Sequence, residues 1–402
     1  MLELNKLTKQ VDSMAEALAG QRDRQRKDIE AARELLLKHA QVTDELCSKI
    51  ARAGEVDESW RGADPLGDDL NERFQTAEDG PPATLVGSDG SQIYPDTHAI
   101  ALYYLTNVGT IVLRQGSGEA PLVTTEPILR MAEDDPLEEQ DQDRVDADEV
   151  NLRRDLREVE ALAALARSER EKLSGDMDRV VVALADGPLL PWMPQRLTDR
   201  EQTQHVKQFT APLDDMRASY AVPLGYVDRP RSANVLRLLH LAGLPYDAIT
   251  KENLRRGSSE RPLKGLSDAG LFQDLLPGQR SALFAATSEI NANFDTAGHR
   301  IYFCYMNVAT EMGEKQARMV RIEMPVWIAT DPARLEAALT AVWSDCRLLG
   351  YPYLLTRAHE LALVTRQEKD TLEQMLRTGM MRLEMRVEES PKATTKRVVG
   401  GR

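Results

Sequence analysis

The chain has few cysteines, no long apolar run and no phosphate-binding loop, and each shortage excludes a class of protein. Its three cysteines, Cys47, Cys304 and Cys346, lie far apart without metal-ligand spacing. We therefore expect buried thiols in a reducing cytosol rather than a disulfide framework. No run of about 18 apolar residues occurs, so a membrane span is not expected. The amphipathic start has no apolar core or cleavage site of a signal peptide, which predicts a cytoplasmic protein.

What is present is the composition of a globular chain. Of its 402 residues, 42% are hydrophobic and 29% are charged, enough for a large core with appendages. The net charge of −14 argues against a nucleic-acid partner until its distribution is considered. Residues 133–149 hold ten acids and one base, whereas residues 217–264 carry nine lysines and arginines against four acids. A positive face that binds a phosphate backbone and an ordinary solvated surface both remain open.

Helical spacing dominates the first 50 residues, where apolar side chains recur every three or four positions. They are Leu4, Leu7, Val11, Met14 and Leu18, then, beyond a break predicted near Gly20, Ile29, Ala32, Leu36 and Ala40. We expect residues 1–53 to form a helical, coiled-coil-like extension, covered by the core, a second copy or another protein. Residues 54–82, rich in Gly, Asp and Pro, predict a linker, and residues 381–402 predict a disordered tail.

A sheet is expected to begin at residue 83. An apolar run at 83–88 ends in Asp89-Gly90-Ser91, and the runs 98–105 and 110–114 flank a predicted hairpin turn at 107–109. An acidic insert at 133–149 precedes a predicted helix at 150–173. The apolar run 180–185 then predicts a strand buried on both faces, ending in Asp186-Gly187. Further strands are predicted at 221–227, 301–309 and 318–329, and helices at 232–243, 332–349, before His359 and at 367–378.

Two aspartates stand at matching positions in this pattern, each after an apolar strand and each before a glycine. Glycine allows a sharp turn that exposes the preceding carboxylate, although an Asp-Gly pair alone predicts only a turn. If the two strands are parallel neighbours, Asp89 and Asp186 come together, and the intervening helix adds a third carboxylate. Such oxygen ligands suit Mg²⁺ or Mn²⁺, and a pair of these ions can cleave a phosphodiester. Three strands, a helix and a fourth strand, with acids so placed, form the ribonuclease H-like arrangement.

Several further motifs follow in a fixed order over residues 83–380. They are Asp89-Gly90-Ser91, Asp186-Gly187-Pro188-Leu189, GYVDRPRSANVL, RIEMPVW and GYPYLLTRAHELALVTRQEKDTLEQML. This ordered set resembles the NurA nuclease family of archaea and bacteria. The resemblance implies an α/β, ribonuclease H-like mixed sheet flanked by helices, and a toroid-like homodimer. It also implies a metal-dependent DNA nuclease, acting as a 5′–3′ exonuclease, a single-strand endonuclease or both. Its cofactor would be Mn²⁺, or Mg²⁺, with two ions, and its partner in DNA end resection and repair a hexameric HerA-type ATPase.

The resemblance also assigns the carboxylates. Asp89 and Asp186 match the two metal-binding aspartates of the family. For the ligand on the helix, the family's Arg-then-Glu pattern favours Glu158, four residues after Arg154. Glu160 stays in reserve, because helical periodicity alone does not decide between the two glutamates.

Two late residues complete the expected site. His359 resembles the family's late histidine and is expected as a catalytic residue and metal ligand. Without the resemblance, it would be a partly buried histidine satisfied by the backbone. Tyr351 is expected to stack on a base or reach a phosphate, the alternative being core packing. Glu323 is expected to pair with Arg321 rather than bind metal.

Two other functions remain open at this point. A degenerate nuclease fold could serve as a DNA clamp or an ATPase adaptor, which would suit the long N-terminal helices and the acidic charge. A ribonuclease H-like enzyme could also act on RNA or hybrids. Because no G-x-x-x-x-G-K-[ST] sequence occurs, energy for unwinding would have to come from another protein.

Overall fold

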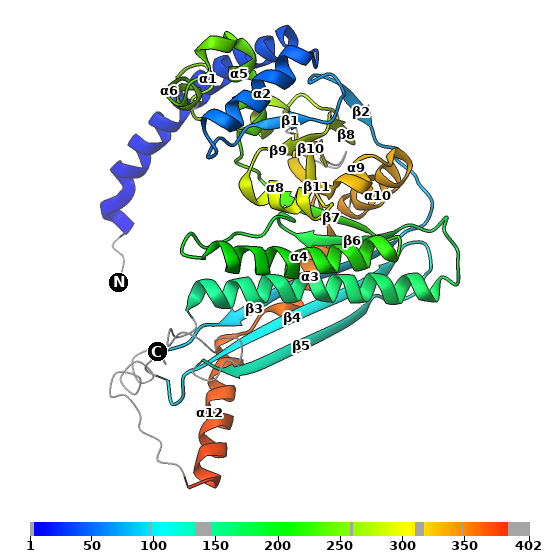
Figure 1. Ribbon diagram of the computed structural model, residues 1–402. Coiled ribbons are helices and arrows are strands. Elements are labelled where there is room, and N and C mark those ends of the chain that lie inside the picture. The colour runs from blue at the N-terminus through cyan, green and yellow to red at the C-terminus, as the bar shows by residue number, and fades with distance from the viewer. Residues whose placement is uncertain are drawn as a thin grey trace. The chain divides into compact units, whose positions relative to one another are not determined.

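The computed structural model describes residues 4–96, 99–132, 146–257, 260–309, 317–347 and 349–384 (Figure 1). Most of the acidic insert predicted at 133–149, and the tail from residue 385, lie outside these ranges. The chain divides into two compact units. Unit 1 comprises Met1–Asp79 and Gly225–Glu336, and unit 2 comprises Gly80–Leu224 and Ala337–Arg402.

Unit 2 is built on a mixed sheet with the strand order β6-β3-β4-β5. The strands β3, β4 and β5 pair antiparallel in succession, and β6 lies parallel to β3. The helix α3 connects β5 with β6 along the chain, so the order is three antiparallel strands, a helix and a parallel fourth strand. This order confirms the predicted ribonuclease H-like fold class. The strands are β3 (Thr84–Ile93), β4 (Tyr103–Arg114), β5 (Leu122–Met131) and β6 (Val181–Asp186).

Helices cover both faces of this sheet. The helix α3 packs against β3 and runs beside α4, and α11 packs against β3 and β4 (Figure 1). Because side chains alternate along a strand, β3 meets α3 through Ser88, Gly90 and Gln92, and α11 through Gly87, Asp89 and Ser91. The helices of unit 2 are α3 (Ala147–Lys172), α4 (Asp199–Ala218), most of α10 (Pro332–Cys346), α11 (Tyr353–Ala362) and α12 (Arg366–Arg382).

The hairpin turn predicted at residues 107–109 is wrong. The strand β4 continues through these residues, and the third strand is β5, which the sequence analysis did not identify. A Cβ at Gly109 would lie 2.6 Å from the nitrogen of Ala362 and 2.7 Å from the oxygen of Ala358. The glycine therefore serves a close approach of α11 to the sheet rather than a turn.

The two Asp-Gly pairs differ in the structure. At Gly187 the prediction holds, since β6 ends at Asp186 and Gly187 has a φ of +122°, a conformation that favours glycine. At Gly90 the predicted turn is wrong, because β3 continues to Ile93. A Cβ at Gly90 would overlap Glu158 Oε1 and approach the Arg154 side chain. Gly90 thus leaves room for a side chain of α3.

Unit 1 holds the strand order β1-β9-β10-β11-β7, with β2 joined to β10 through β8. The strand β7 begins in unit 2 at Val222 and lies in unit 1 from Gly225. The strands are β1 (Ala63–Pro65), β2 (Arg73–Gln75), β7 (Val222–Asp228), β8 (Gln279–Ser281), β9 (Phe284–Ala286), β10 (Ile301–Asn307) and β11 (Met319–Pro325). The helices are η1 (Leu4–Leu7), α1 (Thr8–Lys38), α2 (Asp44–Val56), α5 (Asn234–Gly243), η2 (Tyr246–Ala248), α6 (Lys251–Arg256), α7 (Asp268–Leu271), α8 (Glu289–Thr296) and α9 (Val326–Ala329).

The first 82 residues differ from the extension and linker that their composition predicts. The helix α1 is continuous through Gly20, where a break was predicted, because one exposed glycine costs a helix only about 1 kcal/mol. The second half of α1, all of α2 and the predicted linker bury apolar side chains in the core of unit 1. They are Ala32, Leu36, Leu46, Ile50, Ala53, Trp60, Ala63 and Leu70.

Two expectations from the composition can be compared with the structure: that the cysteines are buried thiols, and that no segment spans a membrane. The three cysteines are free; Cys304 and Cys346 are buried as predicted, but Cys47 is exposed on α2. In the part of the chain that the structure describes, no helix is both long and apolar enough to cross a membrane.

Candidate active site

Asp89 and Asp186 stand on neighbouring parallel strands. The paired register of β3 and β6 ends with Ser88 opposite Ala185, and the next residue on each strand is an aspartate. Neighbouring strands lie about 4.8 Å apart, and side chains at paired positions share a face of the sheet. The predicted parallel pairing is therefore confirmed, and it brings the two carboxylates to one edge of unit 2.

The two late residues join these aspartates. The Nδ1 atom of His359 lies 2.7 Å from Oδ2 of Asp89, and the Tyr351 hydroxyl donates to Oδ1 of Asp186 at 3.0 Å. Because a carboxylate only accepts, His359 Nδ1 is the donor in this hydrogen bond, which leaves Nε2 outside it. The His359 side chain is 59% exposed, so that nitrogen can reach a ligand in solvent.

Glu158 approaches β3 from α3. The Ser88 hydroxyl donates to the Glu158 carbonyl at 2.9 Å and fixes this turn of the helix against the strand. Arg154 Nε lies 3.1 Å from Glu158 Oε1, but its hydrogen bonds go to Asp155 and Gln92. Glu158 Oε1 is buried and accepts no hydrogen bond from the described residues.

The electrostatic environment of Glu158 links it to the two strand aspartates. Burial raises the pKa of Glu158 well above its ordinary value, and the negative charges of Asp155, Asp89 and Asp186 raise it further. The Arg154 charge opposes this rise. Of these four carboxylates, all but Asp155 belong to the predicted site.

Glu160 lies in another environment. Together with Gln208 and Asp215 it lines a hollow of about 410 Å³ between α3 and α4. Burial raises its pKa and the charge of Arg157 lowers it, without a contribution from either strand aspartate. The charges of Asp89 and Asp186 therefore act on the pKa of Glu158, whereas neither contributes to that of Glu160.

The candidate ligands lie on two faces of the sheet of unit 2. Within the described ranges, no three His, Cys, Asp or Glu side chains stand close enough to hold a metal together. Asp89 is engaged with His359 on the α11 face, and Glu158 is paired with Arg154 on the α3 face. Carboxylate oxygens are nevertheless the ligands of Mg²⁺ and Mn²⁺. Glu158 Oε1 is a buried carboxylate oxygen without a donor among the described residues, so its chemistry fits a divalent cation.

Several supporting residues were not identified from the sequence. Gln92 and Asp155 accept hydrogen bonds from Arg154 and hold its guanidinium beside Glu158. On α10, Asp345 accepts the backbone N–H of Leu354 at 3.0 Å and so caps the start of α11. Burial raises the pKa of Asp345 to about 6. Pro352 indicates only that a helix starts here. The capping carboxylate lies nine residues upstream of Leu354, so the local sequence does not reveal it.

A family model described as the NurA domain matches residues 83–364, well over half of the chain. The chain belongs to the NurA domain family. This match confirms the resemblance drawn from the motifs and places the chain in a family of nucleases. It begins at residue 83, where the sheet was expected to begin. A comparison with curated proteins gave no match.

Three solved structures are similar to the chain at low identity. The NurA nuclease from Sulfolobus solfataricus is 11% identical over 84% of this chain and 94% of that one, with a TM-score of 0.45. A NurA structure bound to dAMP and manganese is 12% identical over 81% and 92%, with a TM-score of 0.34. The catalytic domain of human endonuclease V is 15% identical over 83% and 99%, with a TM-score of 0.31. At these TM-scores the family assignment rests on the domain match alone.

Proposed function

We propose that this NurA domain is a metal-dependent deoxyribonuclease with Asp89, Glu158, Asp186 and His359 as its metal ligands. The observation that carries this proposal is Glu158 Oε1, a buried oxygen to which no described residue donates. An unsatisfied buried acceptor costs about 1–3 kcal/mol, and a bound cation would offset this cost. The adjacent register positions of Asp89 and Asp186 support the same assignment.

The chain's own residues supply orientation and proton transfer. Bound Mn²⁺ or Mg²⁺, as two ions, would activate water and stabilise the leaving oxygen of a phosphodiester. Asp89 holds the His359 proton on Nδ1, so that Nε2 is available to bind a ligand or accept a proton. By donating to Asp186, the Tyr351 hydroxyl fixes the orientation of that carboxylate at the end of β6.

We infer DNA as the substrate, cleaved as a 5′–3′ exonuclease, a single-strand endonuclease or both, in the end resection that precedes repair. Membership of the NurA domain family supports this inference. We also propose that the protein acts in the cytoplasm.

A cleavage assay tests the substrate and the metal together. Labelled single- and double-stranded DNA and RNA are incubated with the protein in Mn²⁺, Mg²⁺ or EDTA. We expect DNA cleavage with Mn²⁺, weaker cleavage with Mg²⁺ and none with EDTA. Cleavage that survives EDTA would overturn the metal requirement, and cleavage of RNA alone would overturn the choice of DNA.

A second candidate function is a DNA clamp or ATPase adaptor without catalysis. The ion pair between Arg154 and Glu158 favours it, because this arginine occupies the place of a cation beside the glutamate. A protein that binds DNA but cleaves none of the substrates in any metal would establish this alternative.

We further propose that the protein is a homodimer that works with a hexameric HerA-type ATPase. The start of the chain supports an assembly role, since four large apolar side chains are exposed on η1 and the first half of α1. They are Leu4 at 69%, Val11 at 60%, Met14 at 64% and Leu18 at 47%. Leu4, Val11 and Leu18 recur every seven residues, and Met14 follows Val11 by three, which is the spacing of a coiled-coil seam.

Paired substitutions test this assembly without damaging the core. Val11→Glu with Met14→Glu should weaken dimerisation in light scattering or capture of a HerA-type ATPase in a pull-down. The exposed Glu16→Gln is the matched control on the same helix. Deletion of residues 1–50 is unsuitable, because Leu36 and Ile50 belong to the core of unit 1. A double variant that still dimerises and binds the ATPase would remove α1 from both interfaces.

A further inference from the structure

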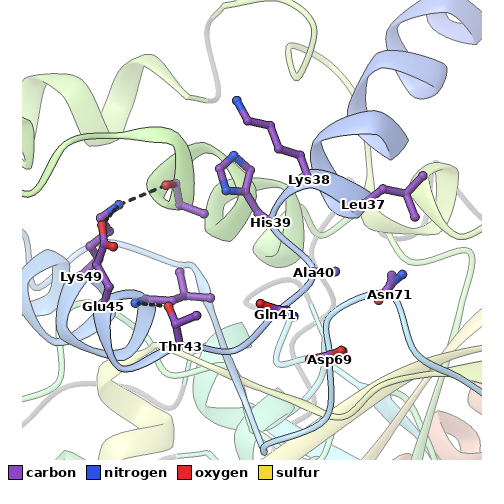
Figure 2. A pocket seen from close by; sticks show the side chains of 12 residues that line it. Leu37, Lys38, His39, Ala40, Gln41, Thr43, Glu45, Lys49, Asp69 and Asn71 are labelled. Atoms are coloured by element: carbon purple, nitrogen blue, oxygen red, sulfur yellow. Dashed lines mark hydrogen bonds and ion pairs between the residues drawn. The ribbon is translucent and has the colours of Figure 1, made fainter.

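Unit 1 contains a polar pocket of about 550 Å³ where the end of α1 meets the start of α2 (Figure 2). Sites for small molecules typically measure about 300–1,000 Å³. Lys38 and His39 come from the end of α1, Lys49 from α2, and Asp69 and Asn71 from the loop before β2 (Figure 2). None of the candidate catalytic residues lines this pocket.

Lys38, His39 and Lys49 each bring a nitrogen group to one side of the pocket, and Asp69 and Asn71 lie on the other side (Figure 2). The Lys49 side chain is only 9% exposed, and its Nζ donates to the Ala242 carbonyl at 3.2 Å and lies 2.9 Å from Glu45 Oε1. An ammonium group has three N–H donors, so a third remains for a ligand. Within the described ranges, Lys38 makes no hydrogen bond or ion pair, and the buried His39 Nε2 has no hydrogen-bond partner.

The field at this end is positive. Burial lowers the pKa of His39, and the charges of Lys38 and Lys49 lower it further. Glu45 neutralises part of the Lys49 charge, but the Glu45 side chain is 73% exposed and therefore screened by water. An anionic group is the ligand chemistry that satisfies Lys38, Lys49 and His39 together.

The other end of the pocket carries the carboxylate of Asp69 and the side-chain amide of Asn71. The N–H of Leu70 donates to the Ala40 carbonyl at 2.7 Å and ties the loop that carries Asp69 and Asn71 to the end of α1. A carboxylate accepts from hydroxyl or amine groups, and an amide both accepts and donates. This end therefore suits a neutral group rich in hydrogen-bond donors rather than a second anion.

We propose that this pocket binds a nucleotide through its 5′-phosphate, with the phosphate at Lys38, His39 and Lys49. The sugar hydroxyl or base amine lies at Asp69 and Asn71. The choice of a nucleotide among anions rests on the proposed function, whose products carry nucleotide phosphates. The ligand is either a free mononucleotide or the 5′-phosphorylated end of a strand, since both present the same chemistry.

Binding is measured by calorimetry on the full chain carrying Asp186→Ala, in EDTA, so that the candidate active site neither holds metal nor cleaves. The probes are dAMP, deoxyadenosine, inorganic phosphate and a 5′-phosphorylated oligonucleotide. We expect dAMP to bind, and Lys38→Gln to weaken its binding about tenfold or more through loss of a charge-assisted contact. The control, Lys9→Gln on the exposed part of the same helix, should bind like the parent.

Each probe or variant tests one part of the proposal. Absence of dAMP binding, an unaffected Lys38→Gln variant, or deoxyadenosine that binds as tightly as dAMP would overturn the phosphate site. If inorganic phosphate binds as tightly as dAMP, the assignment of a nucleotide as the ligand is overturned. Oligonucleotide binding that depends on Lys38 assigns the strand end, and binding of dAMP alone assigns the free nucleotide. If the parent cleaves nothing but Lys38-dependent binding persists, the proposed function fails while the pocket assignment stands.

Discussion

Each unit buries a cluster of charged and polar side chains, and the two clusters differ in how completely they are hydrogen bonded. In unit 1, the fully buried Asp268 carboxylate accepts the backbone N–H groups of Val235 and Leu236 at 3.1 and 3.0 Å. It also accepts the hydroxyl of Tyr305 at 3.0 Å, and that hydroxyl meets Ser232 Oγ at 2.7 Å. These contacts tie α7 to the start of α5.

The same cluster continues through a buried ion pair. Arg321 Nη2 lies 2.7 Å from Glu323 Oε1, and Arg321 Nη1 donates to Asn234 at 3.1 Å. The expected pairing of Glu323 with Arg321 is thereby confirmed. Each charged group here has a partner of opposite charge or a hydrogen-bond donor, so the cluster is closed.

The cluster of unit 2 is open by comparison. Glu158 has an arginine beside it, yet no described residue donates to its buried Oε1. Asp186 is exposed at the end of β6, and Asp89 is partly exposed on the neighbouring strand β3. Buried polar groups are nearly always satisfied in stable proteins, so the closed cluster indicates a structural role and the open one a ligand.

The largest expected effect comes from removing a strand aspartate. We expect Asp89→Ala and Asp186→Ala each to lower the rate of DNA cleavage on the order of a thousandfold, the scale of losing one preorganised electrostatic group. The fold should be retained, because removing one carboxylate relieves repulsion in the absence of metal. Steady-state cleavage rates measure the loss.

Thermal melts with and without Mn²⁺ provide the control for these two variants. Added Mn²⁺ should raise the melting temperature of the parent more than that of either variant, because a ligand stabilises the state it binds. Parent-like cleavage by both variants would show that the open cluster is not the active site.

The next effect separates two glutamates on one helix. Glu158→Gln should lower the cleavage rate on the order of a hundredfold, the lower end of the scale for one electrostatic group. Glu160→Gln should stay near the parent rate, because Glu160 faces α4. Without metal, Glu158→Gln should also be the more stable protein at neutral pH, since burial and the charges of neighbouring carboxylates disfavour the ionised form of Glu158. The reverse order of rates would transfer the ligand to Glu160.

Much of this site was predictable because its signals are local. The apolar run before Asp186, the helical stripe around Glu158 and the order of the elements each depend on a few neighbouring residues. Glycine was the ambiguous signal. Gly187 ends a strand, but Gly90 and Gly109 lie within strands where a helix approaches the backbone, and sequence alone does not show that approach.

The features that were not predicted depend on distant partners. The strand β5 is exposed at the sheet edge, so it has no alternating apolar pattern, and Pro127 argues against a strand. The Asp268 carboxylate caps α5 from more than 30 residues away, and Asp345 caps α11 from another helix. Residues 54–82 have a linker composition, but Trp60 and Leu70 are buried by helices that the sequence does not place beside them.

A smaller effect tests the closed cluster. Glu323→Gln leaves the buried Arg321 without a charged partner, and removing one member of a buried pair costs about 3–5 kcal/mol in unfolding free energy. The control is Glu252→Gln, whose ion pair with Arg256 is exposed on α6 and is worth about 1 kcal/mol or less. Urea unfolding measures both. If Glu323→Gln cost no more than the control, the contrast between the two clusters would be lost.

The smallest effect concerns Asp345, a buried carboxylate that is hydrogen bonded and yet has a raised pKa. Its folded pKa of about 6 lies above the ordinary value of 3.8, so the folded state binds the proton more tightly. The stability from this group is therefore full below about pH 4 and is lost as the pH rises to about 6. The difference corresponds to about 3 kcal/mol at most. Asp268, whose pKa is also raised to about 6, adds a similar loss in the parent and in every Asp345 variant.

Asp345→Asn isolates the contribution of this one carboxylate. Its amide oxygen still accepts the Leu354 N–H, so α11 and His359 stay in place and cleavage should remain near the parent rate. Relative to the parent, the unfolding free energy of Asp345→Asn should rise between pH 4 and pH 6 and then level off. Asp345→Ala loses the cap as well, so its cleavage rate should fall, because α11 no longer holds His359 against Asp89. A difference between Asp345→Asn and the parent that stays constant from pH 4 to pH 7 would show that the backbone donors fully compensate the buried charge.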